Sequence, residues 1–318
     1  MSARPSAPAA ARRAMTDGIV LLDKPFGLSS NAALQRVKRL LAAARAGHAG
    51  TLDPLATGML PVCLGQATKV CGELLGATKA YRVGLALGTS TTTGDLEGEP
   101  LARAAVPLFD TATVSARLQG FVGQHEQVPP MHAAIKHNGT PLYRLARAGM
   151  TVERRPRQIE LHRLTLRAYR GDFLEFDVEC SKGTYIRVLG EDVAASLGTV
   201  GHLAALHRLW VEPFATAAMV TLDELAAWTV EASVSGLPPW WRAADSALSS
   251  LRRLDLDDAS ARALRQGKVV DLAVAEGPAR VYDPTGQFLG LVDVDAARHA
   301  RVRRFFVGAP PPRTHTDT

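Results

Sequence analysis

One aspartate stands in a loop bracketed by glycines, in the segment GHAGTLDPLATG that runs from Gly47 to Gly58. Asp53 precedes Pro54, which biases the backbone of the aspartate toward the extended region and fixes the φ of the proline. A carboxylate held in this way is positioned at little further entropic cost, as acid, base or nucleophilic catalysis requires. On local pattern alone, Asp-Pro in a glycine-rich loop is more often an ordinary turn. The loop is therefore a candidate site that the rest of the chain must support.

The segments around this loop have the patterns of the elements that would position it. GIVLLDKP, residues 18–25, predicts a short buried strand that ends in a turn. SSNAALQRVKRLLAA, from Ser29, has apolar residues at helical spacing and a choice of capping residues at Ser29, Ser30 or Asn31. We expect a second helix over residues 66–75 and a strand that begins at Tyr81.

The middle of the chain continues the alternation of short strands and helices. TPLYRLARAG predicts a short helix capped by Thr140, with Pro141 at its first position and Gly149 just beyond its end. LEFDVEC alternates apolar and acidic residues, which is typical of a half-buried strand, and the following SKGTYIRVLGEDVAASLG predicts a helix that ends at Leu197.

The order of these elements indicates an α+β fold, because strands and helices do not alternate strictly as in a doubly wound sheet. VSGLPPWWRA, near residues 234–243, breaks the pattern like a domain boundary. From Leu251 onward the segments are short, and two strands around an Asp-Pro-Thr-Gly turn predict a small β-rich unit.

Composition limits the classes of protein that the chain can form. Its 318 residues suit two domains, and a hydrophobic content of 47% allows a large core. No apolar run approaches the ~20 residues of a membrane span, so no membrane association is expected. The three cysteines form no C-x-x-C pair, which argues against a disulfide framework or a zinc site and favours the cytoplasm.

Positive charge is concentrated in one part of the sequence. The formal net charge of the chain is +6, yet residues 136–170 alone hold nine Lys or Arg and only two Glu. Such a local excess is typical of a surface that faces a polyanion, although a solvated basic face has the same composition. By contrast, residues 1–16 and 309–318 are predicted to be a disordered N-terminal extension and tail.

Five blocks of the sequence resemble the TruB type of bacterial tRNA pseudouridine synthase, in the order of that family. The first is RAGHAGTLDPLATGMLPVCLG, which LLDKPFGLSSN precedes, and the second is KAYRVGLALGTSTTTGD. QVPPMHAAIKHNGTPLYRLARAGMTVERRPR resembles the family's basic RNA-gripping insertion, and CSKGTYIRVLGEDVAASLG and GHLAALHRLWV complete the core. The resemblance covers about residues 18–214 and is specific, because separate motifs agree.

The resemblance implies a domain organisation. It predicts a mixed, mostly antiparallel sheet with flanking helices as a catalytic domain over residues 17–247, with the basic insertion at about 127–158. Residues 248–308 would form a small β-rich, PUA-like RNA-binding domain. This part resembles the family more loosely, by its position in the chain and its β-rich pattern.

The resemblance also implies roles for individual residues by matched position. Asp53 would be the essential carboxylate and Arg187 its partner, while Tyr81 would stack on the target uracil and is a candidate for removing the C5 proton. The surroundings of the base would be formed by His48, which fills the space of the extruded nucleotide, Tyr185 and Leu206, which line the pocket, and Lys24, which supports the site. One departure is TSTTTGD, which leaves the role of Asp95 open.

The implied activity is the isomerisation of uridine 55 in the T-loop of tRNA, without cofactor or metal, by a monomer that binds the T-stem-loop. Whether Asp53 attacks C1′ or takes the 2′ proton stays open at this point. One alternative is a non-catalytic tRNA-binding or tRNA-folding protein, for which Asp53 would be dispensable. A metal-dependent hydrolase using His48, His132 and His137 ranks far lower, because no pair has the spacing of a helical zinc motif.

Overall fold

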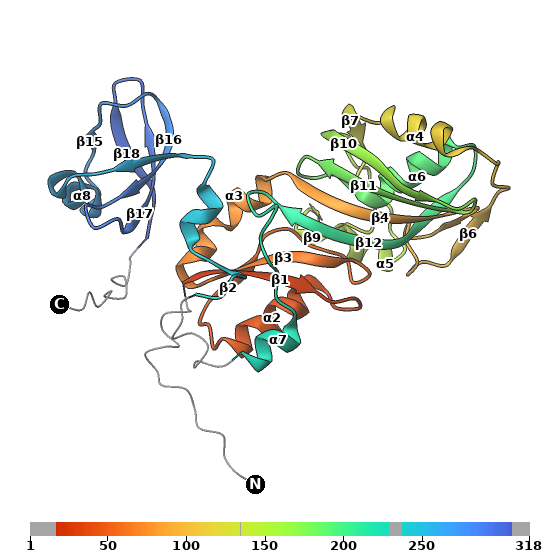
Figure 1. Cartoon of the computed structure of the whole chain (residues 1–318), viewed down its shortest axis with the longest axis horizontal. Coiled ribbons are helices and arrows are strands. Elements are labelled where there is room, and N and C mark those ends of the chain that lie inside the picture. The colour runs from red at the N-terminus through yellow and green to blue at the C-terminus, as the bar shows by residue number, and fades with distance from the viewer. Residues whose placement is uncertain (1–16, 134, 229–236, 307–318) are drawn as a thin grey trace, which may run out of the picture.

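A computed structural model of the chain describes residues 17–133, 135–228 and 237–306, which form a long mixed sheet with helices and a smaller C-terminal sheet (Figure 1). The α+β prediction is confirmed. The predicted N-terminal extension and tail lie outside the described residues. Within those residues, no helix has both the length and the apolar character needed to cross a membrane.

The main sheet has nine strands. Adjacent strands are antiparallel except for β3 and β12, which run parallel to each other. Along the sheet the order is β13-β1-β3-β12-β4-β11-β10-β7, and β2 pairs with the free part of β3. The strands are β1 (Gly18–Lys24), β2 (Ala46–His48), β3 (Thr57–Leu64), β4 (Lys79–Leu87), β7 (Gly123–Gln127), β10 (Arg157–Tyr169), β11 (Phe173–Cys180), β12 (Gly201–Val211) and β13 (Trp241–Arg242).

Strand β1 is buried on both faces of the sheet. Val20 and Leu22 belong to the core that also holds helix α2 (Ser30–Leu40), whereas Ile19 and Leu21 belong to a second core on the opposite face. A strand covered on both sides has no solvent-facing positions, which explains why its sequence is a continuous apolar run and does not alternate.

The far end of the sheet is covered on one face only. Helices α4 (Thr111–Gln119) and α6 (Ile186–Ser196) share the core with the inward side chains of β11. The outward side chains of β11 are acidic, and Asp177 contacts Arg82 at 2.9 Å and Arg167 at 2.6 Å. Part of the basic stretch 136–170 is thus neutralised by the neighbouring strand, because the register places the two sets of charges opposite one another.

Two local predictions were wrong in detail. The helix expected over 66–75 is a 3₁₀ segment (Gly65–Val70) followed by α3 (Cys71–Gly76), because the backbone at Val70, with φ −101° and ψ 0°, interrupts a continuous helix. Helix α5 (Leu142–Arg147) has Pro141 at its cap, not Thr140. Thr140 lies instead in a two-residue strand, β9 (Thr140–Pro141), which pairs with β8 (Lys136–His137).

The remaining helix caps and strand positions agree with the sequence patterns. Ser29 caps α2 and accepts a hydrogen bond from the amide of Ala32. Gly149 and Gly198 follow their helices with φ of +72° and +71°, a conformation that glycine adopts without strain. The smaller elements between these are β5 (Thr89–Thr91), β6 (Pro100–Arg103) and α7 (Leu222–Ala227).

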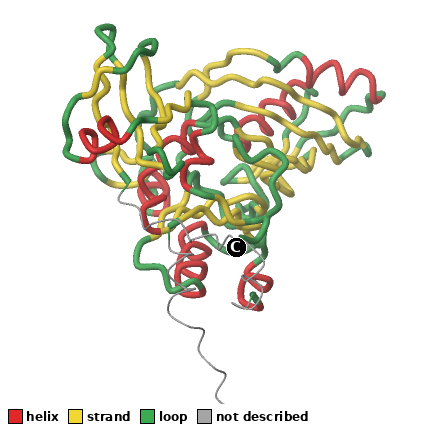
Figure 2. Tube along the Cα trace, turned by 60° about the vertical axis from the view of Figure 1, so that its left-hand side comes forward, coloured by secondary structure: helices red, strands yellow, loops and turns green. Residues whose placement is uncertain are grey.

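The C-terminal unit is a five-stranded sheet with the helix α8. Figures 1 and 2 show it at one end of the molecule. Leu291 and Phe306 of this unit share a core with Ile19 of the main sheet, and Lys69 donates a 2.6 Å hydrogen bond to the carbonyl of Phe305. The domain boundary predicted after residue 247 falls within the 3₁₀ segment Ala244–Leu248. The elements of the unit are β14 (Arg252–Asp255), α8 (Asp258–Arg265), β15 (Val270–Asp271), β16 (Gly277–Tyr282), β17 (Phe288–Val294) and β18 (His299–Phe305).

The parallel contact between β3 and β12 sets a strict limit on side-chain size at Gly58. Gly58 has φ +95°, and a Cβ atom there would lie 2.3 Å from the carbonyl oxygen of Arg208. We expect Gly58→Ala to lower the free energy of unfolding by about 3 kcal/mol, because overpacking adds to backbone strain.

The matched control is Gly286→Ala, since Gly286 has φ +78° but no atom within 4 Å of the added carbon. This variant should lose only about 1 kcal/mol. Urea unfolding of both variants checks the prediction, and equal losses would show that β12 does not confine Gly58.

Candidate active site

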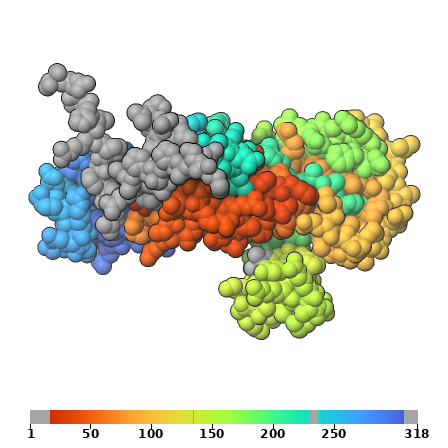
Figure 3. All heavy atoms as spheres, turned by 90° about the horizontal axis from the view of Figure 1, so that it is seen from below, coloured from red at the N-terminus to blue at the C-terminus, as the bar shows by residue number. Residues whose placement is uncertain are grey.

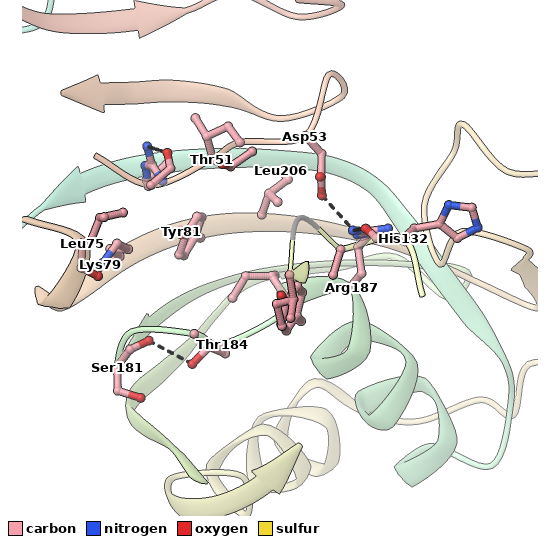
Figure 4. A pocket seen from close by; sticks show the side chains of 18 residues that line it. Thr51, Asp53, Leu75, Lys79, Tyr81, His132, Ser181, Thr184, Arg187 and Leu206 are labelled. Atoms are coloured by element: carbon pink, nitrogen blue, oxygen red, sulfur yellow. Dashed lines mark hydrogen bonds and ion pairs between the residues drawn. The ribbon is translucent and has the colours of Figure 1, made fainter. Parts of the chain in front are cut away.

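The predicted site residues gather around a cavity of about 390 Å³ on the main sheet (Figure 4). Its walls come from the loop between β2 and β3, from β4 and β12, and from the start of α6. Five of the seven residues singled out in the sequence line it, namely Asp53, Tyr81, Tyr185, Arg187 and Leu206.

The loop that carries Asp53 is fixed on both sides of the aspartate by hydrogen bonds. The hydroxyl of Ser30, the first residue of α2, donates to the carbonyl of Leu52 at 2.9 Å and accepts from its amide at 2.7 Å. The carbonyl of Pro54 accepts a 2.8 Å bond from the amide of Gly27. The backbone on either side of Asp53 is therefore anchored to other parts of the fold.

Lys24 lies beneath this loop and not in the cavity wall. Its side chain is fully buried, and its Nζ donates to the carbonyls of Leu28 at 2.5 Å, Pro25 at 2.9 Å and Pro54 at 3.3 Å. Burial lowers the pKa of Lys24 to about 8, and the nearby Asp53 carboxylate opposes that shift.

Asp53 faces Arg187, whose Nε lies 3.1 Å from Asp53 Oδ2, as the dashed line in Figure 4 marks. The Arg187 side chain is only 6% exposed, and its other nitrogens are also engaged. Nη1 donates to the carbonyl of Thr93 at 3.0 Å and Nη2 to the carbonyl of His132 at 2.6 Å. Asp95 Oδ2 is 3.7 Å from Nη1, so one guanidinium contacts two carboxylates.

The start of α6 is held by an amide side chain from β7. Gln127 donates to the carbonyl of Tyr185 at 3.1 Å and accepts from the amide of the same residue at 2.7 Å. Tyr185 is the N-cap residue of α6, and Arg187 is its second helical residue. This pairing therefore fixes the point from which Arg187 reaches Asp53.

Two opposing effects act on the Asp53 carboxyl. Burial, the larger effect, raises its pKa above the usual value because the protein excludes water from the charged form. The positive charge of Arg187 opposes this shift, while the buried Asp95 adds to it. The Asp53 side chain is 36% exposed, so the carboxyl is partly shielded from water while Arg187 favours its charged form.

Tyr81 and Leu206 form the apolar part of the cavity. They lie on the neighbouring strands β4 and β12, and both are mostly buried, with 8% and 7% of their surfaces exposed. Burial raises the pKa of the Tyr81 phenol, and the guanidinium of Arg208 opposes that shift. The ring is thus neutral at physiological pH and available for stacking.

His48 is not among the residues that line the cavity. It lies in β2 opposite Val62 of β3, and its Nδ1 is buried without a hydrogen-bond partner among the described residues. Burial and the charge of Arg208 lower its pKa.

The other two histidines considered for a metal site are elsewhere. His132 borders the cavity and His137 lies in β8. In the part of the chain that the structure describes, no three His, Cys, Asp or Glu side chains are grouped so that they could hold a metal ion.

Three basic residues of the cavity were given no role in the uridine site from the sequence, namely Lys79, His132 and Arg208. Arg208 could have been found, because it lies two residues after Leu206 in a strand and therefore shares its face. Lys79 precedes the strand start that was expected at Tyr81. His132 gave no usable signal, since only the folded loop brings it to Arg187.

Comparison with known families covers almost the whole described chain. Residues 38–186 match the TruB family pseudouridylate synthase N-terminal domain, and residues 187–254 match the tRNA pseudouridylate synthase B C-terminal domain. Residues 251–307 match the C-terminal domain of tRNA pseudouridine synthase II.

Whole proteins of the same kind are similar over nearly their full length. A tRNA pseudouridine synthase B of Ectopseudomonas mendocina is 46% identical over 300 residues, which cover 93% of this chain and 98% of the relative. The protein of that name from Aromatoleum aromaticum is 47% identical over 285 residues, covering 89% and 91%. The chain belongs to the TruB family. The resemblance inferred from the sequence motifs is confirmed.

The TruB fold is also found in solved structures of more distant sequence. A chain in a crystal structure of a Cbf5-Nop10-Gar1 complex superposes with a TM-score of 0.71 at 22% identity, covering 95% of this chain and 87% of that one. This likeness confirms the predicted sheet architecture, and the match over residues 251–307 confirms the PUA-like C-terminal unit of this TruB protein.

The direction of the Asp53 pKa shift makes a prediction about stability. Because the folded-state pKa is raised, ionised Asp53 destabilises the fold above the pKa of the unfolded chain, and this penalty is lost as the pH falls through the folded-state pKa. Asp53→Asn should therefore have a Tm at or above wild type at about pH 8, and the difference should shrink as the pH falls through the raised pKa toward the usual value of 3.8.

Asp177→Asn is the matched control, because the pKa of Asp177 is lowered by its bonds to Arg82 and Arg167. This variant should have a lower Tm than wild type at about pH 8. Calorimetry across the pH range measures the Tm of each variant and of wild type. A marked loss of Tm in Asp53→Asn at the higher pH would show that the Arg187 pairing outweighs the burial of the carboxylate.

Proposed function

We propose that the chain is a tRNA pseudouridine synthase that isomerises uridine 55 in the T-loop. The observation that carries the proposal is the pairing of Asp53 with Arg187 in the wall of a cavity that Tyr81 also lines. The family membership and the names of the similar proteins agree with this substrate class.

The proposed reaction requires only groups that side chains supply. The C1′–N1 bond of uridine breaks, the uracil turns, a C1′–C5 bond forms, and the C5 proton leaves while N1 regains a proton. Nothing is oxidised or reduced, and no group is imported. We therefore propose that the reaction proceeds without a cofactor.

A single carboxylate suits an isomerisation better than a hydrolysis. Glycoside hydrolases commonly use two carboxylates, one for the leaving group and one for water or the nucleophile. Asp53 is the one acid among the described residues that line the cavity. In an isomerisation the leaving uracil is retained, so one acid can act at C1′ or at the 2′ position, and either action requires the ionised form.

The apolar side of the cavity suits an extruded base. Removing a uridine from its stack costs a few kcal/mol, and stacking on an aromatic ring returns about 1–3 kcal/mol per base. In our proposal Tyr81 receives the uracil face, Tyr185 and Leu206 enclose it, and Lys24 holds the Asp53 loop from below. His48 lies outside the cavity, which is compatible with its proposed insertion into the space left in the RNA.

A separate lobe of the molecule is a candidate surface for the T-stem-loop. In Figure 3 the segment around α5 protrudes from the body. Its arginines Arg144, Arg147 and Arg155 are exposed and take part in none of the ion pairs found among the described residues. Arg167 of β10 is also exposed, but it is paired with Asp177. We propose that this lobe contacts RNA phosphates, and that the enzyme acts as a monomer in the cytoplasm.

The alternative function is a non-catalytic tRNA-binding or tRNA-folding protein with the same surface. It would have no use for a carboxylate that is kept partly from water, since burying an ionised acid costs free energy. Such a protein would therefore tolerate a neutral residue at position 53.

Asp53→Asn separates the two functions directly. We expect the variant to bind tRNA like wild type but to form no pseudouridine, since the amide can neither attack nor take a proton. Position-resolved mapping of pseudouridine in unmodified tRNA after incubation with each protein measures this. Binding of tRNA without any conversion by wild type itself would support the binding protein. Substantial conversion by the variant would overturn the role of Asp53, and conversion at another position would overturn uridine 55.

Tyr81→Leu tests the proposed receiver of the base. We expect tRNA affinity within about tenfold of wild type but a collapse of turnover, because phosphate contacts dominate affinity while the ring acts on the extruded base. Filter binding and single-turnover conversion measure the two quantities. Weaker binding with unchanged chemistry would contradict the stacking role.

A further inference from the structure

Arg208 is a buried cation beside the cavity that the proposed mechanism does not use. Only 1% of its surface is exposed, and it is among the largest fully buried side chains. It lies in β12, which runs between β3 and β4, opposite Gly58 on one side and Tyr81 on the other. Arg208 is thus next to both segments that carry the proposed reactive groups.

The guanidinium joins the two ends of the loop that holds Asp53. Its Nη2 donates to the carbonyl of Gly50 at 3.1 Å, and its Nε donates to the carbonyl of Met59 at 2.6 Å. Gly50 precedes Asp53 by three residues, and Met59 follows it by six. One planar group with rigidly spaced donors therefore closes the loop across its base.

The loop is shaped to approach this arginine closely. Gly50 has φ +92°, and a Cβ atom there would lie 3.2 Å from Arg208 Nη1. A side chain at position 50 would therefore press directly on the guanidinium, and glycine leaves the space that the contact requires.

Arg208 has no carboxylate partner among the described residues. All the ion pairs found there are formed by other side chains. A buried charge without a counter-ion is costly, so an apolar residue would serve better if the position only filled the core. The charge acts on the cavity side, where it favours the ionised form of the Tyr81 phenol against the effect of burial.

We propose that Arg208 is a positioning residue, which fixes the Asp53 loop and the Tyr81 strand in one geometry. The inference rests on the proposed function, because it assigns a use to that arrangement. A misplacement of about 1 Å at a reacting group can cost about a hundredfold in rate. Loss of the hydrogen bonds from Arg208 to Gly50 and Met59 should therefore slow the chemical step and leave tRNA affinity nearly unchanged.

The first test is Arg208→Lys, which keeps the positive charge but has no planar fork to hold two carbonyls. We expect its single-turnover rate to fall about a hundredfold, while its Kd for tRNA stays within about threefold of wild type. Rates are compared below the Tm of each protein, so that the folded fraction is the same.

The second test displaces the guanidinium without replacing it. Gly50→Ala should show the same slow rate and unchanged Kd, because the added carbon pushes on Nη1. Gly171→Ala is its control, since Gly171 also has a positive φ, of +70°, but meets no atom within 4 Å and lies in the β10–β11 turn. The control should keep the wild-type rate.

Wild type and Asp53→Asn are assayed in the same experiment, so that a failure of the proposed function can be told apart from a failure of the positioning role of Arg208. A wild type that makes no pseudouridine would overturn the proposed function and with it this inference. An active wild type with an inactive Asp53→Asn, but a wild-type rate for Arg208→Lys, would overturn the inference alone. Parallel losses of rate and affinity would also overturn it, and if Arg208→Lys does not fold, the Gly50 and Gly171 pair decides.

Discussion

The guanidinium of Arg187 and the carboxylate of Asp53 meet at 3.1 Å in the wall of the cavity that Tyr81 also lines. Burial favours the neutral acid and the arginine favours the charged one, so the ion pair opposes the shift in pKa that burial causes. Arg187 is itself buried and contacts a second carboxylate, Asp95, as well as two backbone carbonyls. The arginine is therefore fixed before any substrate arrives, and our proposed mechanism depends on that preorganisation.

The architecture of the sheet explains how residues far apart in sequence reach this one place. Strand β12 lies at the centre, parallel to β3 and antiparallel to β4, and it brings Arg208 to both. Helix α6 delivers Arg187 from the opposite side of the cavity, and the amide of Gln127 fixes its first turn. The Asp53 loop is thus held by contacts from α2, β12 and α6, although its own sequence is short and rich in glycine.

Local patterns predicted the elements and the candidate acid, but not the contacts between them. The strand at 18–24, the cap at Ser29 and the Asp53 loop follow from apolar runs, capping residues and Asp-Pro chemistry that act over a few residues. The break at Val70 has no signal in the local pattern. The hairpin that pairs Thr140 with His137 is local, with Asn138 and Gly139 at φ +49° and +83° in its turn, so its Asn-Gly signal was overlooked in the sequence. His132 reaches Arg187 only in the folded loop, whereas the strand alternation that places Arg208 on the face of Leu206 could have been used in the sequence. Arg187 was assigned to Asp53 from the resemblance to a family and not from residue spacing.

We propose that Asp53 meets the ribose of an extruded uridine, and a crystal structure of Asp53→Asn with the tRNA T-stem-loop would show whether it does. We expect uridine 55 to lie outside its stack, with its base on the Tyr81 ring and its C1′ and 2′ carbons in van der Waals contact with the side chain at position 53. A uridine that stays stacked within the loop, or a side chain at position 53 turned away from the sugar, would contradict it.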